Sequence, residues 1–207
     1  MKPILARNRN TEKGIFLAAN SESQRLVKGL GKVFWCTALF ALALAPVPAP
    51  AAPPDLQTPE PVIYLADNLD EQDRLGYCID TVGRGLSDRL HAHSCKPHGG
   101  DVQFYYNRAS RQIVSATYSG KCATLNASAA VGVSLGLVDC SVASSGQMFD
   151  YNSETLAFRP GGDHSLCLAV GVTSRTAGPF MSRNLELAPC GSTDARYRQW
   201  RIKGGKT

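Results

Sequence analysis

The sequence predicts an all-β fold in which three similar units close into a barrel with pseudo-threefold symmetry. The first observation is a repeated pair of cysteines, found as Cys78/Cys95, Cys122/Cys140 and Cys167/Cys190. The first members of the pairs are 44 and 45 residues apart, and the second members are 45 and 50 apart. The second observation is that each pair precedes a short motif that ends in an aromatic residue. A period in this range is typical of a repeat architecture.

Each unit is expected to hold four short strands, because extended segments alternate with Gly, Ser, Asn and Pro clusters. In the first unit they are Val62–Leu65, Gly76–Ile79, Leu90–Ser94 and Gln103–Tyr106. In the second they are Ile113–Ala116, Gly120–Leu125, Ser134–Val138 and Met148–Tyr151. In the third they are Leu156–Phe158, Leu166–Val170, Asn184–Ala188 and Trp200–Ile202. A closed barrel of such units leaves few exposed strand edges.

The two ends of the repeated region are expected to meet. The last predicted strand begins at Trp200, and Val62–Leu65 is expected to lie beside it. The charged insert Asn68–Arg74 then reads as a surface loop. No stretch after residue 52 has convincing helical periodicity.

The six cysteines after the leader predict a disulfide framework. An even number of cysteines in an exported chain is typical of such a framework. The repeat favours pairing within each unit, which joins residues 78–95, 122–140 and 167–190. In the chain-entropy model a loop of this length stabilises the fold by about 3 kcal/mol.

The charge distribution argues against nucleic-acid binding. The chain of 207 residues has a formal net charge of +5. Seven Lys/Arg and two Asp/Glu precede Pro53, so Pro53–Thr207 carries 15 of each sign and is neutral. A neutral domain lacks the basic surface that phosphate binding requires.

The N-terminal residues 1–52 predict a leader with a secretory signal peptide. An uncharged apolar core at Val33–Ala45 follows Lys28 and Lys32, and Ala49-Pro50-Ala51 offers a small-residue cleavage site. A membrane-spanning helix needs about 20 apolar residues, so this core favours a cleaved signal over a permanent anchor. The chain is therefore expected to be secreted or periplasmic, with membrane contact only through an uncleaved leader. Residues 53–61 read as a Pro/Ala linker.

The region before the apolar core leaves one alternative open. Its 32 residues are long for the basic part of a signal peptide. Translation that starts internally at Val27 would shorten it, and N-terminal sequencing of the precursor would decide between the two starts.

The three aromatic motifs carry a resemblance to a known family. They are Gln103-Phe104-Tyr105, Gln147-Met148-Phe149 and Arg198-Gln199-Trp200, with arginine in place of glutamine in the last. With Cys78-Ile79-Asp80 and the paired second cysteines, they resemble the ricin-type (R-type) lectins. The resemblance covers roughly Val62–Lys203 and implies a β-trefoil domain over residues 62–207, with repeats near 62–108, 109–153 and 154–207. It also implies that the final aromatic residues fill the centre where the repeats meet.

The resemblance implies one candidate sugar site, in the first repeat. In the family, an aspartate two residues after the first cysteine binds sugar hydroxyls, and an aromatic residue two before the second cysteine stacks on the ring. Asp80 stands at the first of these positions and His93 at the second, with His91 as the earlier polar group and Gln103 in support. Val102 takes the place of the family asparagine, and Asp101 lies beside it.

The second and third repeats lack these groups. The four positions hold Thr124, Gly136, Val138 and Gly146 in the second repeat, and Ala169, Glu186, Ala188 and Tyr197 in the third. Neither set is suited to a sugar, so at most one site is expected.

Several residues of the first repeat have other interpretations. An equal alternative is that Asp80 caps a turn through its carboxylate. His91, His93 and His98 form a histidine-rich stretch, but their spacing matches no zinc motif and Cys95 is expected in a disulfide, so no metal or other cofactor is predicted. Asn126-Ala127-Ser128 is a formal glycosylation sequon.

The sequence favours a carbohydrate-binding protein that is not an enzyme. It contains no nucleophile elbow, phosphate-binding loop or dinucleotide fingerprint, and its carboxylates are scattered. The expected partner is a glycan, with galactose-type sugars favoured by the resemblance. The alternative is a degenerate trefoil that binds a separate protein subunit, similar to the delivery subunits of multi-chain bacterial toxins. A trefoil protease inhibitor ranks third, because nothing marks a reactive loop.

Overall fold

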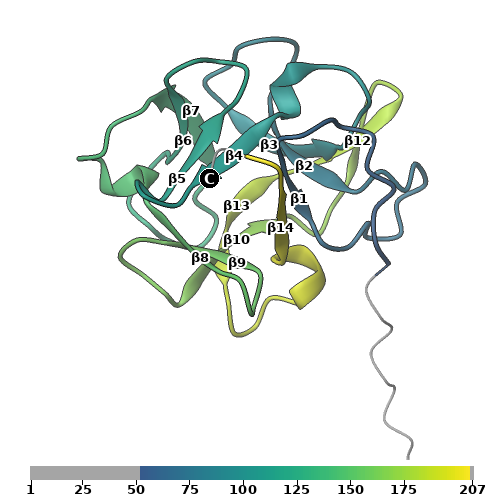
Figure 1. Cartoon of the computed structure of the whole chain (residues 1–207). Helices are drawn as coiled ribbons and strands as arrows, with labels where there is room; N and C mark the ends of the chain where they lie inside the picture. Colours follow the sequence, from purple (N-terminus) through teal and green to yellow (C-terminus); the bar gives the residue numbers. More distant parts are fainter. Residues whose placement is uncertain (1–51, 206–207) are drawn as a thin grey trace, which may run out of the picture. The chain divides into compact units, whose positions relative to one another are not determined.

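The computed structural model describes residues 52–205 (Figure 1). The leader, its apolar core at residues 33–45 and the predicted signal peptide lie outside these residues. Between residues 52 and 205, no helix has the length and apolar character needed to cross a membrane.

The described residues form an all-β trefoil of three four-strand repeats. Six strands pair into the three hairpin-like ladders of a barrel, and each ladder joins two neighbouring repeats. These strands are β1 (Val62–Leu65), β4 (Phe104–Asn107), β5 (Gln112–Ser115), β8 (Phe149–Asn152), β9 (Ala157–Pro160) and β14 (Trp200–Lys203). Strand β1 pairs with β14 in the register Leu65↔Trp200, which closes the barrel as predicted.

Three further hairpins, one in each repeat, cover one end of the barrel. They are β2 (Tyr77–Thr81) with β3 (Leu90–Ser94), β6 (Lys121–Leu125) with β7 (Leu135–Asp139), and β10 (Leu166–Val170) with β13 (Leu185–Pro189). All twelve predicted strands are therefore present, each with bounds within two residues of the prediction. The repeat-derived fold class is confirmed.

The third repeat contains two strands that were not predicted. They are β11 (Arg175–Ala177) and β12 (Phe180–Arg183). Together they form a hairpin, named here the inter-repeat hairpin, because the other edge of β12 pairs with β3 of the first repeat. It extends one sheet to the order β11-β12-β3-β2-β1-β14. The extra length lies within the third disulfide loop, whose cysteines are 23 residues apart against 18 in the second repeat.

All three predicted disulfides are formed. They join Cys78 to Cys95, Cys122 to Cys140 and Cys167 to Cys190. Each bond links the first strand of a capping hairpin to the segment that follows the second strand. The three disulfides therefore occupy equivalent positions in the three repeats. Such bonds are typical of chains that fold in an oxidising compartment.

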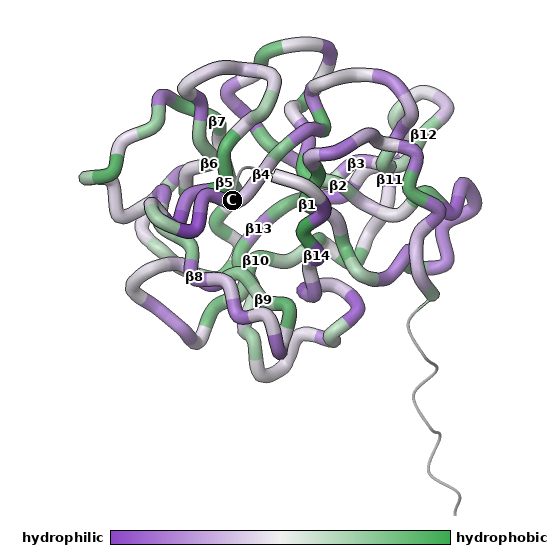
Figure 2. Tube along the Cα trace, in the orientation of Figure 1, coloured by the Kyte–Doolittle hydropathy of each residue, from purple (hydrophilic) through white to green (hydrophobic). Residues whose placement is uncertain are grey.

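The core lies where the three repeats meet, and hydrophobic stretches of β1, β10 and β13 gather there in Figure 2. Trp200, Phe149 and Phe104 have no exposed surface. The indole N–H of Trp200 donates to the Leu168 carbonyl at 2.9 Å, so its polar atom is satisfied inside the core.

The first-repeat aromatic residue of the core differs from the prediction. Tyr105 was expected to fill the centre, but it is only half-buried, and Phe104 occupies that place. Strands β4 and β8 begin at Phe104 and Phe149, nine residues after the second cysteines Cys95 and Cys140. In these two repeats the core aromatic residue therefore lies at the same distance from the second cysteine, and Gln103 is not the counterpart of Gln147.

Residues 53–61, predicted as a linker, lie along the first repeat. The Thr58 hydroxyl donates to the Lys96 carbonyl at 2.9 Å, and the Gln57 amide donates to the Cys95 carbonyl at 3.3 Å. Leu56 packs against the small core cluster of Val62, Cys78, Cys95 and Val102. This segment thus has ordered contacts that a Pro/Ala composition did not predict.

The charged insert Asn68–Arg74 is a loop, as predicted, but only part of it faces solvent. Asn68 is buried, while Asp70 is exposed. Glu71 forms an ion pair with Arg183 of β12, in which both side chains are nine-tenths or more buried. The insert therefore helps to anchor the inter-repeat hairpin.

Candidate functional site

Strands β2 and β3 bring together three of the four predicted site residues. The antiparallel register places Asp80 opposite His91 and Cys78 opposite His93. Side chains alternate along a strand, so His91 and His93 lie on the same face of β3. Their ring centroids are 5.4 Å apart.

The carboxylate of Asp80 lies beneath this pair of imidazoles. Its side chain is 1% exposed, and its Oδ2 lies 3.0 Å from the Lys96 ammonium, 3.7 Å from Nδ1 of His93 and 3.9 Å from Nε2 of His91. Lys96 also donates to Asp101 at 3.1 Å. One ammonium thus joins two carboxylates, and the lysine directly follows the disulfide that fixes the end of β3.

Several polar atoms around Lys96 have no partner within the protein. Oδ1 of Asp80, Oδ1 of Asp101 and Nε2 of His91 are buried and make no hydrogen bond to another residue. A buried polar atom without a partner costs about 1–3 kcal/mol, so this arrangement favours a ligand that donates and accepts hydrogen bonds.

Burial dominates the protonation of the cluster. It raises the pKa of Asp80 to about 7, against the opposing attraction of Lys96. Burial also lowers the pKa of His91 to about 4 and lowers the pKa of His93. For Lys96, burial alone would lower the pKa, but the carboxylates Asp80 and Asp101 outweigh it and raise the pKa. At neutral pH the imidazoles are neutral and the ammonium is charged.

A pocket of about 790 Å³ opens above the cluster. Residues of all three repeats line it. Its charged and imidazole side chains are Arg84, His91, His93, Lys96, His98 and Asp101. Thr117 and Tyr118 come from the second repeat, and Ala177, Gly178, Pro179 and Phe180 come from the inter-repeat hairpin. The remaining lining is glycine, at Gly83, Gly85, Gly99 and Gly100.

Asp80 itself does not line the pocket. Its carboxylate lies below His91, His93 and Lys96, which do. A ligand in the pocket therefore contacts His91, His93 and Lys96, the side chains that lie next to Asp80. It would contact the unpaired Oδ1 of Asp80 only if Lys96 moved.

Gln103, the fourth predicted site residue, lies away from the pocket. Its side-chain amide donates to the carbonyls of Glu60 at 3.1 Å and Pro59 at 3.3 Å. The register of β4 explains this placement, since the position equivalent to Gln147 is the buried Val102. The residue before it, Asp101, takes the place expected for the family asparagine and does reach the pocket.

The equivalent positions in the other two repeats form no comparable cluster. Thr124 bonds only weakly, to the Leu125 carbonyl at 3.5 Å, and Val138 is 40% exposed. Ala169 is buried in the third repeat. A small hollow of about 250 Å³ beside Ser128 and Gly146 has no charged side chain in its lining.

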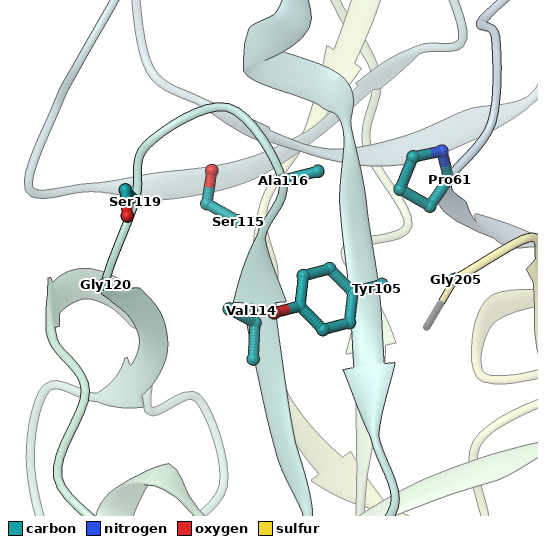
Figure 3. A pocket seen from close by; sticks show the side chains of 8 residues that line it. All are labelled: Pro61, Tyr105, Val114, Ser115, Ala116, Ser119, Gly120 and Gly205. Carbon is teal, nitrogen blue, oxygen red and sulfur yellow. The ribbon is translucent and has the colours of Figure 1, made fainter. Parts of the chain in front are cut away.

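A second pocket, of about 360 Å³, lies at the β4–β5 hairpin (Figure 3). Tyr105, Val114, Ser115 and Ser119 line it, and Figure 3 shows the Tyr105 ring beside Val114. The pocket contains no charged side chain and no buried unpaired polar atom. The pocket above Asp80 and Lys96, called the first-repeat pocket below, has charged side chains in its lining and buried unpaired polar atoms beside it. It is therefore the better candidate site.

The ring atoms of the histidine-rich stretch do not converge with other metal-ligating side chains in the described part of the chain. Among residues 52–205, no three His, Cys, Asp or Glu side chains converge so that they could hold a metal ion. Cys95 is in a disulfide, and the ring of His93 bonds the Ser94 carbonyl through Nδ1 at 3.0 Å.

Sequence reasoning did not name Lys96, Tyr118 or Phe180 as site residues, and it placed Asp101 beside the family asparagine position instead of at it. Lys96 follows Cys95 directly, and Asp101 was assigned to a neighbouring position because the aromatic motif was aligned on Gln103. The long spacing from Cys167 to Cys190 was the only signal of the inter-repeat hairpin that carries Phe180. Tyr118 lies between β5 and β6 of the second repeat and reaches the pocket through tertiary packing.

Neither the protein-family models nor the curated proteins contain a match to this chain. Solved structures do show similarity to it. The β-trefoil lectin of the Vibrio vulnificus hemolysin/cytolysin, with N-acetyl-D-lactosamine bound, is similar over 71% of this chain and 95% of its own, at 15% identity and a TM-score of 0.46.

Two other solved structures are also similar to this chain. GalNAc-T7 with UDP, GalNAc and Mn²⁺ is 16% identical over 73% of this chain, with a TM-score of 0.45, and the match covers 23% of its length. The Haemophilus ducreyi cytolethal distending toxin is 15% identical over 68% of this chain and 81% of its own, with a TM-score of 0.44. The assignment of a trefoil to this chain rests on its strand pairing and its threefold disulfides.

Proposed function

We propose that the chain is an exported, non-catalytic carbohydrate-binding protein of the R-type lectin kind, with one sugar site in the first repeat. The trefoil domain extends over residues 62–207, and the leader directs it to the periplasm or out of the cell. The observation that carries this proposal is the buried Asp80–Lys96 pair beneath a pocket lined by His91, His93 and Asp101.

The chemistry of this cluster suits a sugar. A pyranose presents a fan of hydroxyls beside an apolar ring face, and hydrogen bonds to charged groups are the stronger ones. The Lys96 ammonium and the Asp101 side chain line the pocket and can bond hydroxyls, and the imidazole of His93 stands in the position where the family has an aromatic residue. Asp101 supplies the polar group at the asparagine position.

The titration of the disulfide-intact chain with galactose, N-acetylgalactosamine and lactose tests the proposal. We expect Asp80→Asn to weaken binding by about tenfold or more, because Lys96 loses one of its two carboxylate partners and hydrogen bonds to charged groups contribute about 1.5–3 kcal/mol. Asp139→Asn is a matched control, since Asp139 pairs with Lys121 in the second repeat and its side chain is 89% exposed. Equal binding by both variants and the wild type would refute this site.

A second candidate function is a protein-binding scaffold or delivery subunit. The exposed apolar side chains of the domain favour it: Leu86, Val131, Val138, Val142 and Val172 are each at least 40% exposed. Co-purification from the source cells separates the two functions. A stoichiometric protein partner supports the scaffold, and retention on a galactose resin supports the lectin.

A further inference from the structure

The inter-repeat hairpin gives the first-repeat pocket a wall from the third repeat. Strand β12 pairs with β3 in the registers Ser182↔His93 and Arg183↔Ala92, so the hairpin runs beside the two imidazoles. Its turn contributes Ala177, Gly178, Pro179 and Phe180 to the pocket. A site confined to one repeat would end at β3.

The hairpin is held firmly against the first repeat. The Met181 amide donates to the Ser94 hydroxyl at 2.9 Å, and that hydroxyl bonds Asp73. Arg183 pairs with Glu71, and its guanidinium lies 5.1 Å from the centroid of the Tyr77 ring. These contacts anchor β12, the strand that begins with Phe180, to the first repeat.

The two walls differ in chemistry. The hairpin wall is uncharged and mostly apolar, whereas the first-repeat wall beside it carries His91, Lys96 and Asp101. Phe180 is a half-buried aromatic residue that lines the pocket. An apolar ring surface next to a polar cluster suits a ligand with hydroxyls at one end and a second apolar face at the other.

The geometry of Phe180 and His93 favours two ligand rings over one. Their centroids are 5.6 Å apart and their planes are inclined by 63°. A single sugar held between two aromatic groups would need the groups to be nearly parallel and wider apart. Rings in edge-to-face contact leave no room for a sugar between them, so one ring at the His93–Lys96 cluster and another against Phe180 would occupy neighbouring places on the pocket wall.

The size of the pocket also favours a ligand with two rings. Its volume of about 790 Å³ lies high in the range of roughly 300–1,000 Å³ that is typical of sites for drug-sized ligands. One pyranose is smaller than such a ligand and would leave much of the hairpin wall uncovered.

We infer that the pocket takes two linked sugar rings, the first at the His93–Lys96 cluster of the first repeat and the second against Phe180 of the third. This inference rests on the proposed carbohydrate function of the same pocket. It makes Phe180 a specificity-determining residue that selects a disaccharide over a monosaccharide.

Calorimetric titration of the full disulfide-intact chain with galactose, lactose and N-acetyllactosamine tests the inference. In the wild type, one of the disaccharides should bind about tenfold more tightly than galactose, the gain expected of an added aromatic contact with its burial. Phe180→Ala and Phe180→Leu should reduce this preference to about twofold or less and leave the galactose affinity within about twofold. Val172→Ala, on the same disulfide loop and 74% exposed, should behave like the wild type.

The possible failures are distinguishable. Equal wild-type affinities for the monosaccharide and both disaccharides, with binding that Asp80→Asn abolishes, would refute the two-ring site and keep the proposed function. Equal weakening of all three sugars by Phe180→Ala and Phe180→Leu would also refute it, because the ring would then only support His93. No binding of any sugar by folded wild type would refute both proposals.

Discussion

At the scale of single residues, the candidate site joins two buried groups whose protonation has opposite effects on stability. Burial raises the pKa of Asp80 from 3.8 to about 7, so the folded state holds this proton more tightly than the unfolded chain. The resulting stabilisation is complete below about pH 4 and is lost as the pH rises through 7. Burial lowers the pKa of His91 from 6.5 to about 4, so its stabilisation is complete above pH 6.5 and is lost as the pH falls through 4.

Two substitutions should separate these opposing contributions. When the pH is lowered from about 7.5 to 4.5, the free energy of unfolding of Asp80→Asn should fall relative to the wild type, and that of His91→Gln should rise. Each slope can reach about 1.4 kcal/mol per pH unit. Urea denaturation at several pH values measures both slopes, and curves that run parallel to the wild type would contradict the pKa directions.

At the scale of elements, each capping hairpin is closed by its own disulfide. The second repeat offers the cleanest test, because Cys122–Cys140 closes a loop of 18 residues that lies apart from the candidate pocket. The double substitution Cys122→Ala/Cys140→Ala should reduce the free energy of unfolding by about 3 kcal/mol.

The same variant should leave the first-repeat site intact. Its sugar affinity at a temperature where it is folded should equal that of the wild type, since the bond touches no residue of the pocket. Denaturation of the two proteins under oxidising conditions measures the loss of stability, and a change below about 1 kcal/mol would show that the hairpin does not depend on its cross-link.

The inter-repeat hairpin shows the limit of repeat-based prediction at this scale. The twelve strands shared by the repeats follow from the cysteine period and the turn residues. Strand β12 pairs with β3 of another repeat, and such a pairing depends on a contact between residues 183 and 92 that no local pattern encodes. The added residues between Cys167 and Cys190 marked an insertion without indicating its partner.

At the scale of the whole molecule, the closed barrel decides which aromatic residues become core. The cysteine spacing places Phe104 and Phe149 at equivalent strand starts, whereas the glutamine motif pointed to Tyr105. The fold class and closure through β1 and β14 were therefore predictable from the sequence. The side-chain set of the site was predictable only in part, because Lys96 was not considered and Tyr118 and Phe180 reach the pocket through tertiary packing.

Two truncations should confirm the assignment of the core. Phe104→Ala removes a side chain with no exposed surface and should lower the free energy of unfolding by about 3–5 kcal/mol. Tyr105→Ala removes a half-buried ring at the surface pocket of Figure 3 and should cost less than about 2 kcal/mol. Chemical denaturation measures the free energy of unfolding of both variants. A larger decrease for Tyr105→Ala than for Phe104→Ala would show that Tyr105 is the core residue, as expected when Gln103 is aligned with Gln147.

The most direct test of the central claim is an NMR titration of the folded, disulfide-intact chain with lactose, followed through the imidazole signals of His91 and His93. The account predicts that these signals and the amide of Asp101 shift together and saturate, while the amides of Thr124 and Ala169 at the equivalent positions stay unchanged. Saturating lactose that leaves the two imidazoles unmoved would contradict a sugar site in the first repeat.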